Sequence, residues 1–518
     1  MKMPTEPANG QEWTLRKLLG CAGVGVADGS SLPDVKVVAL ADDSRRVGVG
    51  DCFVAVRGVA GDGHKFVRDA ASAGASVVVV EEDVTVPTSA VVVRVDDTRV
   101  ALANLAAAYY GLRGYDGQCM SLIGVTGTNG KTTVSWILRS ILEADSRRPA
   151  VIGTVGYDLV TRRQRAELTT PGPVELCRCL AEARLGGADS AVIEVSSHAL
   201  DQHRCDGLSF AAGVFTGLSG DHLDYHGTME RYFGAKRRLF EGLDGDAVAV
   251  INADDPASRR MADATRARVV RYGIDSPGAE VTARIEKTES TGSKFVLCGS
   301  SFEASISTSL VGRYNVSNAL AAAGTAEMLG VGEAAIRRGL ENVSGVAGRL
   351  ERVVSPVSEE GTDRCAAVFV DYAHTDDALA NVLGTLRSLT RGRLVCVFGC
   401  GGDRDRSKRP RMAAAVAGVA DVAWVTSDNP RSEDPQTIND EILPGFGRDC
   451  GCEVHVRIDR KSAIESAIVG ARAGDVVLIA GKGHEDYQLI GDKVLHFDDR
   501  EVARVCLAGL AGVAEDAA

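Results

Sequence analysis

Short apolar runs, rich in valine and isoleucine, alternate along this chain with stretches of helical length. Such runs, bounded by glycine or polar positions, are typical of strands buried on both faces of a parallel sheet. The predicted strands cover residues 35–40, 52–56, 76–80, 90–95, 121–125, 190–195, 211–215, 247–251, 366–370, 393–398, 422–426 and 476–480. Residues 100–110, 134–142 and 228–240 are predicted to be helices. The alternation predicts an α/β fold.

The predicted strands fall into three groups, which indicates three domains. Because a domain usually takes about 100–200 residues, a chain of 518 residues has room for three separate cores. We place the domains at residues 1–118, 119–348 and 349–518. A polar stretch at residues 355–364 is predicted to be a surface loop of the last domain.

Composition narrows the class of protein further. The chain is 45% apolar and 25% charged, as globular proteins are, and its net charge of −12 argues against a nucleic-acid-binding surface. No uninterrupted apolar stretch approaches the length of about 18 residues that a membrane span needs, and no apolar leader is present. The thirteen cysteines show no metal or disulfide spacing. We expect a cytoplasmic protein with reduced thiols, no membrane span and no nucleic-acid partner.

The strongest motif is the segment GVTGTNGKTT at residues 124–133, between a predicted strand and a predicted helix. Glycines there let backbone N–H groups close around phosphates, and the helix N-terminus adds its positive dipole. Glycines alone would be equally consistent with an ordinary strand-to-helix turn that binds nothing. The sequence Gly-Lys-Thr-Thr at the start of a helix instead favours nucleotide binding. We therefore predict that ATP is bound by Gly127, Thr128, Asn129, Gly130, Lys131, Thr132 and Thr133, with the Thr132 hydroxyl on Mg²⁺.

Two acidic segments follow this loop at predicted strand ends. A lone Glu194 would usually be a cap or an ion-pair partner, but beside a phosphate loop it is better explained as a Mg²⁺ ligand. Asp221, His222 and Asp224 are close in sequence and fit either a metal site or a local hydrogen bond. Zinc is disfavoured because no companion cysteine or histidine has ligand spacing, whereas Mg²⁺ accepts oxygen ligands.

Three loops of the last domain also follow predicted strands, so they are expected to share one pocket. Each taken singly could be an ordinary turn. Arginine binds carboxylates, and Asp or Glu binds ammonium groups. An amino acid whose side chain carries a further charged group would therefore match the charged residues of this pocket. The residues we assign to this pocket are Arg404, Asp428, Asn429, Pro430, Arg431, Gly481 and Glu485.

The loop spacing G-x-x-G-x-x-G-K-T resembles that of the Mur ligase and folylpolyglutamate synthetase superfamily of ATP-dependent amide-forming ligases. Further segments, at 221–236, 312–320, 348–351, 428–431 and 481–487, are similar to Mur ligase motifs, so the resemblance covers nearly the whole chain. It implies a three-domain Mur ligase architecture with a central P-loop ATPase domain and a C-terminal Rossmann-like domain.

The resemblance also implies roles that spacing does not show. Lys236 matches the family lysine that carries a carbamate, and a desolvated lysine of lowered pKa is the kind that reacts with CO₂. The catalytic residues would then be Lys131, Glu194, His222 and carbamylated Lys236. Two Mg²⁺ ions would be held by Thr132, Glu194, His222 and Lys236.

Further ligand contacts follow from the same resemblance. The adenosine part of ATP would lie against Asn315, Arg349, Asp371 and His374. A UDP-linked muramoyl dipeptide would be held by Asp42, Ser44, Val59, Ala60, Gly61, Thr169, Thr170, Ser196, Gln202 and Arg204. Leu168 stands where the family often has asparagine, so one contact to this substrate differs.

The Asp-Asn-Pro-Arg string resembles the motif of the meso-diaminopimelate-adding branch of the family, in which Arg431 would read the distal carboxylate. The expected reaction joins meso-2,6-diaminopimelate to UDP-N-acetylmuramoyl-L-alanyl-D-glutamate through an acyl phosphate, in peptidoglycan precursor synthesis. We expect a monomer with small-molecule partners only.

Alternatives remain open at this point. An L-lysine-adding ligase would need a neutral or acidic residue in place of Arg431. A D-glutamate-adding ligase or a folylpolyglutamate synthetase fits the length and the last domain less well. A catalytically inactive nucleotide-binding module would be expected to lack Lys131, Glu194, His222 or Lys236, and all four are present.

Overall fold

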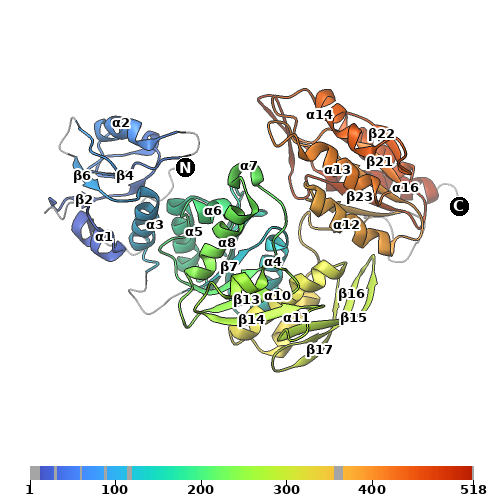
Figure 1. The fold of residues 1–518 in the computed structure, drawn as a ribbon, viewed down its shortest axis with the longest axis horizontal. Helices are drawn as coiled ribbons and strands as arrows, with labels where there is room; N and C mark the ends of the chain where they lie inside the picture. The colour runs from blue at the N-terminus through green and yellow to red at the C-terminus, as the bar shows by residue number, and fades with distance from the viewer. Residues whose placement is uncertain are drawn as a thin grey trace.

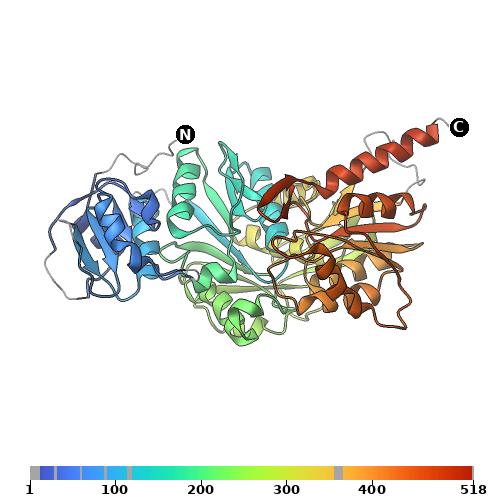
Figure 2. The same ribbon diagram turned by 90° about the horizontal axis from the view of Figure 1, so that it is seen from above.

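Three large sheets divide the chain, and each is formed by one continuous stretch of sequence, while β1-β2 and β24-β25 form two small two-stranded sheets (Figure 1). The computed structural model describes residues 12–27, 32–58, 61–86, 90–113, 120–354 and 366–515. Seen from two directions, the three units follow one another along the long axis, with the N-terminal unit at one end and the C-terminal unit at the other (Figures 1 and 2). The predicted loop at 355–364 lies outside the described residues.

The N-terminal unit has a four-stranded parallel sheet in the order β3-β4-β5-β6. Val77 and Val79 of β5 pack towards α1 and α3, whereas Val78 and Val80 belong to a second core with α2. The elements are β1 (Trp13–Thr14), α1 (Leu15–Ala22), β2 (Lys36–Val37), β3 (Leu40–Ala41), β4 (Cys52–Val54), α2 (Val67–Ser72), β5 (Val77–Val80), β6 (Val91–Arg94) and α3 (Thr98–Tyr109), with 3₁₀ turns at Ser44–Arg46 and Gly63–Phe66. The single strand predicted at 35–40 is therefore divided between β2 and β3.

The central unit is built on an eleven-stranded mixed sheet in the order β10-β9-β8-β11-β7-β12-β13-β14-β15-β16-β17. Strands β8, β11, β7, β12, β13 and β14 are parallel. Of these, β7, β11, β12 and β13 were predicted, whereas β8, β14 and the antiparallel extension β15 to β17 were not. The strands are β7 (Ser121–Thr126), β8 (Pro149–Gly153), β9 (Gly156–Asp158), β10 (Arg163–Gln164), β11 (Ser190–Glu194), β12 (Phe210–Phe215), β13 (Val248–Asn252), β14 (Arg268–Gly273), β15 (Val281–Glu289), β16 (Gly292–Cys298) and β17 (Glu303–Thr308).

Helices cover both faces of this sheet. Ile123 and Val125 of β7 share a core with α4, α10 and α11, while Leu122 shares the opposite core with α5 and α8. That second core is continuous with α3, so the first two units pack directly against each other. The helices are α4 (Lys131–Ala144), α5 (Pro173–Leu185), α6 (Ser197–Asp201), α7 (Leu223–His226), α8 (Met229–Glu241), α9 (Ser258–Ala262), α10 (Arg313–Met328) and α11 (Glu333–Asn342).

The C-terminal unit has a six-stranded sheet in the order β18-β19-β23-β20-β21-β22, parallel except for the edge strand β18. One core lies between the sheet and α12 to α14, and the other lies between the sheet and α15 and α16. The elements are β18 (Glu351–Val353), β19 (Ala367–Asp371), α12 (Asp376–Leu389), β20 (Leu394–Phe398), α13 (Lys408–Ala417), β21 (Val422–Val425), α14 (Pro435–Ile442), a 3₁₀ turn (Leu443–Phe446), β22 (Glu453–Val456), α15 (Arg460–Val469), β23 (Val476–Ala480), β24 (Tyr487–Ile490), β25 (Lys493–His496) and α16 (Asp499–Glu515).

Two general expectations can be compared with this fold. None of the helices in the described ranges is long and apolar enough to cross a membrane. The eleven cysteines that the structure describes are all unpaired, and seven of them are buried.

A buried ion pair joins α15 to α16 in the C-terminal unit, and breaking it is expected to be costly. Arg460 and Asp499 are completely buried, with the two guanidinium–carboxylate contacts at 2.7 and 2.8 Å. Arg460→Met would leave Asp499 as an uncompensated buried charge, so we expect a loss of about 3–5 kcal/mol in the free energy of unfolding.

Urea unfolding followed by tryptophan fluorescence would measure this loss, because Trp424 lies on β21 in the same unit. The double variant Arg460→Met, Asp499→Leu is the control, since replacing both partners by apolar residues should recover most of the stability. Equal destabilisation in the single and double variants would contradict the argument.

Candidate active site

The predicted phosphate loop lies between β7 and α4, where two glycines adopt backbone angles that other residues avoid. Gly127 has φ +149° and a side chain there would collide with the Thr216 hydroxyl, while Gly130 has φ +89° and begins α4. Lys131 Nζ lies 2.9 Å from the carbonyl oxygens of both Gly127 and Thr128. The lysine therefore lies over the loop whose backbone would surround a phosphate group.

Glu194 ends β11 beside this loop and is fully buried. Its carboxylate accepts hydrogen bonds from the Thr132 hydroxyl at 2.9 Å, the Thr154 amide at 2.9 Å and the Thr154 hydroxyl at 3.0 Å. Burial lowers the pKa of Lys131, while the negative charges of Glu194 and Asp221 oppose that shift. A buried carboxylate and a hydroxyl side by side form an oxygen donor set that suits Mg²⁺.

Lys236 on α8 reaches the same loop from the other side. Its Nζ donates a hydrogen bond to the Gly127 carbonyl at 2.7 Å and lies 4.4 Å from the centre of the Tyr232 ring. Burial, assisted by the positive charge of Lys131, holds the pKa of Lys236 well below its usual range. The structure thus places a buried amine of lowered pKa beside the loop, which is the condition the sequence analysis required for a carbamate.

His222 lies in the short turn before α7, with φ +53°. Its Nε2 is 3.4 Å from Asp221 Oδ2, and its ring meets that of His198 edge-on at 4.7 Å between centroids. Burial lowers the pKa of His222 to about 4, so the ring is neutral at pH 7. Within the described part of the chain, no group of three or more His, Cys, Asp or Glu residues is arranged to hold a metal. Thr132 and Glu194 are in contact; a metal role for His222 stays a prediction.

The residues predicted to contact the nucleotide lie around the connection to the last unit. Arg349 donates a hydrogen bond to Thr132 Oγ1 at 3.1 Å and lies 4.4 Å from the Tyr372 ring centre. Asp371 accepts the backbone N–H groups of Leu350 and of Ala373, at 2.6 and 2.7 Å. Its carboxylate therefore fixes the connection between the two units, and direct contact with a nucleotide stays a prediction.

The other two predicted nucleotide contacts also use their polar atoms locally. The Asn315 amide donates to the Val311 carbonyl at 2.9 Å. Asn318 donates to Asn315 Oδ1 at 3.2 Å and lies against Gly130, which places the start of α10 beside the phosphate loop. His374 contacts the Tyr372 carbonyl through Nδ1 at 2.8 Å.

Asp377, at the start of α12, is a contact between units that the sequence did not single out. Its Oδ2 accepts hydrogen bonds from Ser219 Oγ at 2.8 Å and from Asn129 Nδ2, in the phosphate loop, at 3.3 Å. An acidic residue in the first turn of a helix is ordinary, so only the fold could reveal that this one faces the loop. The C-terminal unit is therefore attached directly to the phosphate loop.

Four residues predicted for the dipeptide substrate form one hydrogen-bonded network. The Thr170 hydroxyl donates to the Glu194 carbonyl at 2.6 Å and accepts the Ser196 N–H at 3.0 Å. Arg204 donates to the Thr170 carbonyl and to the Gln202 side chain, both at 2.7 Å. The network positions these polar groups next to Glu194.

The remaining residues of this prediction lie near it or on the N-terminal unit. Thr169 Oγ1 is 3.1 Å from Thr154 Oγ1, and Leu168 is 49% exposed. A carboxylate oxygen of Asp42 comes close to Gly172, just after this segment. Ser44 begins a 3₁₀ turn and the Gly61 carbonyl accepts the Gly58 N–H, while the predicted contacts Val59 and Ala60 lie outside the described residues.

Residues predicted for the amino-acid pocket meet around a buried lysine, Lys482. Its Nζ lies 3.1 Å from Asn429 Oδ1, 3.3 Å from Glu485 Oε2 and 3.8 Å from Asp428 Oδ1. Gly481, with φ +113°, packs directly against Asp428. Burial raises the pKa of Glu485. The structure brings the second and third loops together as predicted, and adds Lys482 as the cation that neutralises their carboxylates.

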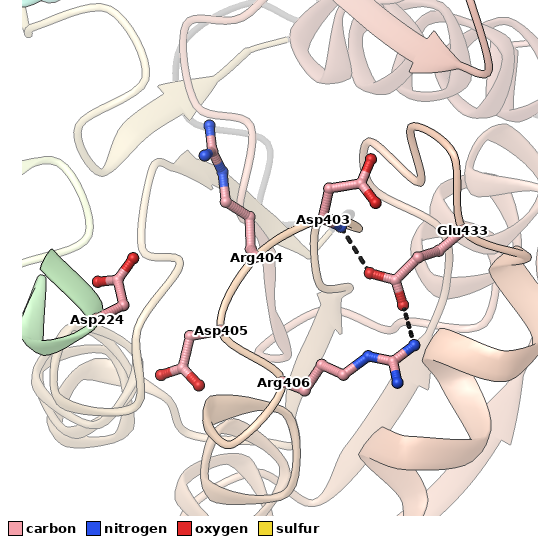
Figure 3. Close-up of a pocket in the computed structure, with 6 residues that line it drawn as sticks. All are labelled: Asp224, Asp403, Arg404, Asp405, Arg406 and Glu433. Atoms are coloured by element: carbon pink, nitrogen blue, oxygen red, sulfur yellow. Dashed lines mark hydrogen bonds and ion pairs between the residues drawn. The ribbon is translucent and has the colours of Figure 1, made fainter. Parts of the chain in front are cut away.

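A charged cavity of about 500 Å³ lies beside Arg404, one of the two predicted arginines (Figure 3). Arg404 lines it together with Asp224, which belongs to the central unit. Arg431, with φ +53°, follows the buried Pro430 and donates through Nη1 to the Gly402 carbonyl at 2.8 Å. The loop of Arg404 lines this cavity directly and the loop of Arg431 lines it through Glu433, opposite Asp224 of the central unit.

A second cavity, of about 240 Å³, lies between the central and C-terminal units. Its lining includes Thr154 and Thr169 beside Glu194, and His484 and Glu485 from the amino-acid pocket. Burial lowers the pKa of His484 to about 3, and its Nδ1 is buried without a hydrogen-bond partner among the residues described. This cavity connects the two predicted substrate sites, and His484 is a lining residue that we did not predict.

Comparison with known proteins gives three matches to family models. They are the Mur ligase family catalytic domain at residues 37–110, the Mur ligase middle domain at residues 125–326, and the Mur ligase glutamate ligase domain at residues 348–483. Together these matches span all three units.

Individual relatives are similar over nearly the full length. The UDP-N-acetylmuramoyl-L-alanyl-D-glutamate–2,6-diaminopimelate ligase of Gloeobacter violaceus is 43% identical over 495 residues, covering 95% of this chain and 98% of the relative. A solved structure with the same name is 34% identical, with a TM-score of 0.65, covering 92% of this chain and 95% of that one. The MurF ligase of Thermotoga maritima in complex with ADP is 19% identical, with a TM-score of 0.58, and covers 92% of this chain and 98% of that one, which shows a shared fold.

Proposed function

The chain belongs to the Mur ligase family, and we propose that it joins meso-2,6-diaminopimelate to UDP-N-acetylmuramoyl-L-alanyl-D-glutamate with hydrolysis of ATP to ADP and phosphate. The observation that carries the proposal is the cavity of about 240 Å³ that Thr154 and Thr169, which lie beside Glu194, line together with Glu485. Its lining on the central unit includes Thr154, which binds the Glu194 carboxylate beside the phosphate loop, and its lining on the C-terminal unit includes Glu485 of the amino-acid pocket. Peptidoglycan precursor synthesis is the process in which this amide is made.

ATP is bound at the phosphate loop, with its phosphates among the backbone N–H groups of residues 127–133 and the Lys131 ammonium group. Arg349, beside Thr132, is positioned to neutralise further negative charge. The adenosine part lies towards Asn315, Asp371 and His374 at the connection between the units.

Thr132 and Glu194 would hold Mg²⁺, since their oxygens are adjacent and the carboxylate has only hydroxyl and amide partners among the described residues. A second ion would be held by His222 and a carbamylated Lys236. Bound Mg²⁺ supplies positive charge that stabilises phosphate oxygens during transfer. The lowered pKa of the Lys236 amine supports this assignment, because only the uncharged amine adds to CO₂.

The reaction proceeds in two steps. The terminal carboxylate of the muramoyl dipeptide attacks the γ-phosphate, which forms an acyl phosphate and releases ADP. Lys131 and the loop N–H groups stabilise the charge that develops, which is electrostatic rather than covalent catalysis by the protein. The neutral amine of diaminopimelate then attacks the acyl carbon, and phosphate leaves as the amide bond forms.

Two groups of residues orient the substrates for this reaction. Thr169, Thr170, Ser196, Gln202 and Arg204 hold the dipeptide next to Glu194. The nucleotide-sugar end extends to Asp42, Ser44, Val59, Ala60 and Gly61 on the N-terminal unit. Arg404 and Arg431 bind the distal carboxylate of diaminopimelate, while Asp428, Asn429, Pro430, Gly481 and Glu485 form the rest of its site.

The proposal includes the domain limits 1–118, 119–348 and 349–518. It also holds that the enzyme acts as a monomer in the cytoplasm.

Phosphate release by the purified protein tests the proposed reaction. With ATP, Mg²⁺ and UDP-N-acetylmuramoyl-L-alanyl-D-glutamate, we expect rapid release when meso-diaminopimelate is added and little with L-lysine, because lysine leaves two arginines without their carboxylate. Equal or faster release with L-lysine would support the ligase activity but show that meso-diaminopimelate is not the preferred acceptor. No release with either amino acid would favour the inactive-module alternative.

A further inference from the structure

Two loops carry the arginines of the amino-acid pocket, and neither is a relaxed backbone turn. The first covers residues 401–406 and includes Arg404, and the second covers residues 428–433 and includes Arg431. Asp403 in the first loop and Arg431 in the second both have φ +53°, a left-handed conformation that residues with side chains seldom adopt. Such conformations persist only where the surrounding structure holds them.

Glu433 provides a direct connection between these loops. Its carboxylate accepts the backbone N–H of Asp403 at 2.6 Å and an N–H of Arg406 at 2.7 Å, as Figure 3 shows. Both of its oxygens also accept hydrogen bonds from Arg409, at 2.9 and 3.1 Å. A single carboxylate at the end of the second loop therefore holds the first loop at both its backbone and its side chains.

Arg409 lies behind this carboxylate, on α13, and its side chain is completely buried. It pairs with Glu441 on α14 at 2.7 Å, in addition to Glu433, and approaches the Gly401 carbonyl. Burying a guanidinium group is unfavourable unless several acceptors surround it, and a buried pair is weak grounds for added stability. Fixing one relative position of α13, α14 and the two loops is the role that this geometry supports.

Further hydrogen bonds join the same two loops. Ser432 donates to the Asp403 carboxylate through its hydroxyl at 2.7 Å and its N–H at 3.1 Å. Gly402 donates its N–H to the Asn429 carbonyl at 2.9 Å, and its own carbonyl accepts a hydrogen bond from Arg431 Nη1. The position of Arg431 relative to the first loop is therefore set by contacts that Glu433 keeps in place.

Arg404, by contrast, is free of internal partners. It is exposed, and the described residues provide it with no hydrogen bond or ion pair. Figure 3 shows Arg404 and Arg406 leaving the loop in different directions, with only Arg406 directed at Glu433. The loop thus uses one arginine for its own structure and leaves the other available to a ligand.

We propose that Glu433, acting with Arg409, is a positioning residue that fixes the spacing of Arg404 and Arg431 and so sets selectivity for an acceptor with a second carboxylate. This inference rests on the proposed function. Two guanidinium groups held at one spacing can bind a carboxylate from two directions, whereas loops that move independently lose that geometry. Both oxygens of Glu433 are engaged by Asp403, Arg406 and Arg409, so its effect on the acceptor is transmitted through the two loops.

The variant Glu433→Gln tests the inference, because it keeps the size of the side chain but removes its charge. We expect the KM for meso-diaminopimelate to rise about tenfold or more, while kcat and the KM for ATP change by less than about threefold. The ratio of kcat/KM for meso-diaminopimelate to that for L-lysine should fall by about tenfold. A merely structural role would lower both values of kcat/KM together and leave their ratio unchanged.

Glu441→Gln is the matched control, since Glu441 also pairs with Arg409 but makes no hydrogen bond to the backbone of either loop among the residues described. We expect it to keep the wild-type ratio. If Glu433→Gln does not fold, the double variant Arg409→Met, Glu433→Met replaces the buried pair with apolar side chains of similar size and should show the same loss of selectivity.

The outcomes separate this inference from the function on which it rests. Wild-type protein that makes no amide with meso-diaminopimelate would overturn the proposed function. Wild-type protein that strongly prefers meso-diaminopimelate, together with variants that keep that preference, would overturn only the role of Glu433.

Discussion

The Lys236→Ala variant is expected to lose activity by about a thousandfold or more in kcat while keeping its fold. Lys236 is completely buried, and its Nζ contacts the Gly127 carbonyl of the phosphate loop at 2.7 Å. If the amine is carbamylated, the substitution removes an anionic ligand from a site that must hold positive charge near the phosphates. Measurement of phosphate release, with thermal unfolding to check the fold, tests this expectation.

Small carboxylates distinguish a carbamate from an ordinary lysine. Formate or acetate can enter the space left in Lys236→Ala and provide an anionic oxygen, so we expect either to restore part of the activity. Lys131→Ala is the control, because there the lost group is a cation and a carboxylate cannot replace it. Activity unchanged in Lys236→Ala, or rescue by ammonium compounds instead of carboxylates, would contradict the carbamate.

The phosphate loop was predictable because all of its determinants are local. A buried strand, three glycines and a lysine at the start of a helix are consecutive in the chain, and the structure places residues 121–144 accordingly as β7, a loop and α4. The buried parallel strands were predictable for the same reason, since burial on both faces produces continuous apolar runs. Glu194 followed from these two predictions, because strand ends in such sheets meet at one edge.

The antiparallel extension of the central sheet was missed for a physical reason. β17 (Glu303–Thr308) buries only alternate residues, so its apolar content is too low to form the continuous run that marked the other strands. β15 (Val281–Glu289) is mostly polar and pairs with β14 only at its first two residues. Half-exposed strands of this kind are weakly specified by composition.

Partners provided by distant segments could not be predicted from local sequence. Thr154 binds the Glu194 carboxylate from the loop after β8, and Asp377 reaches the phosphate loop from α12, more than two hundred positions away. Lys482 was noticed only as part of a glycine-rich turn, although the fold makes it the buried cation of the amino-acid pocket. Spacing identifies residues that act through their neighbours in sequence, whereas these three act through neighbours in space.

Arg431→Met is expected to remove the preference for meso-diaminopimelate. Arg431 would pair with a carboxylate that L-lysine lacks. Because hydrogen bonds between charged groups are strong, losing them should lower kcat/KM for meso-diaminopimelate about a hundredfold or more. The value for L-lysine should stay the same or rise, because the variant no longer has a guanidinium group that lacks its carboxylate partner when L-lysine is bound. Because methionine has the same backbone preference as arginine at φ +53°, the substitution adds no new strain.

Arg391→Met is a suitable control, since Arg391 is exposed on the loop between α12 and β20 and lies outside every predicted site. Steady-state phosphate release with each amino acid gives the two values of kcat/KM for wild type and both variants. A parallel fall with both acceptors would mean that Arg431 serves the shared α-amino-acid end of the substrate. The carboxylate argument requires the two values to diverge, because the added carboxylate is the only group by which the two acceptors differ in charge.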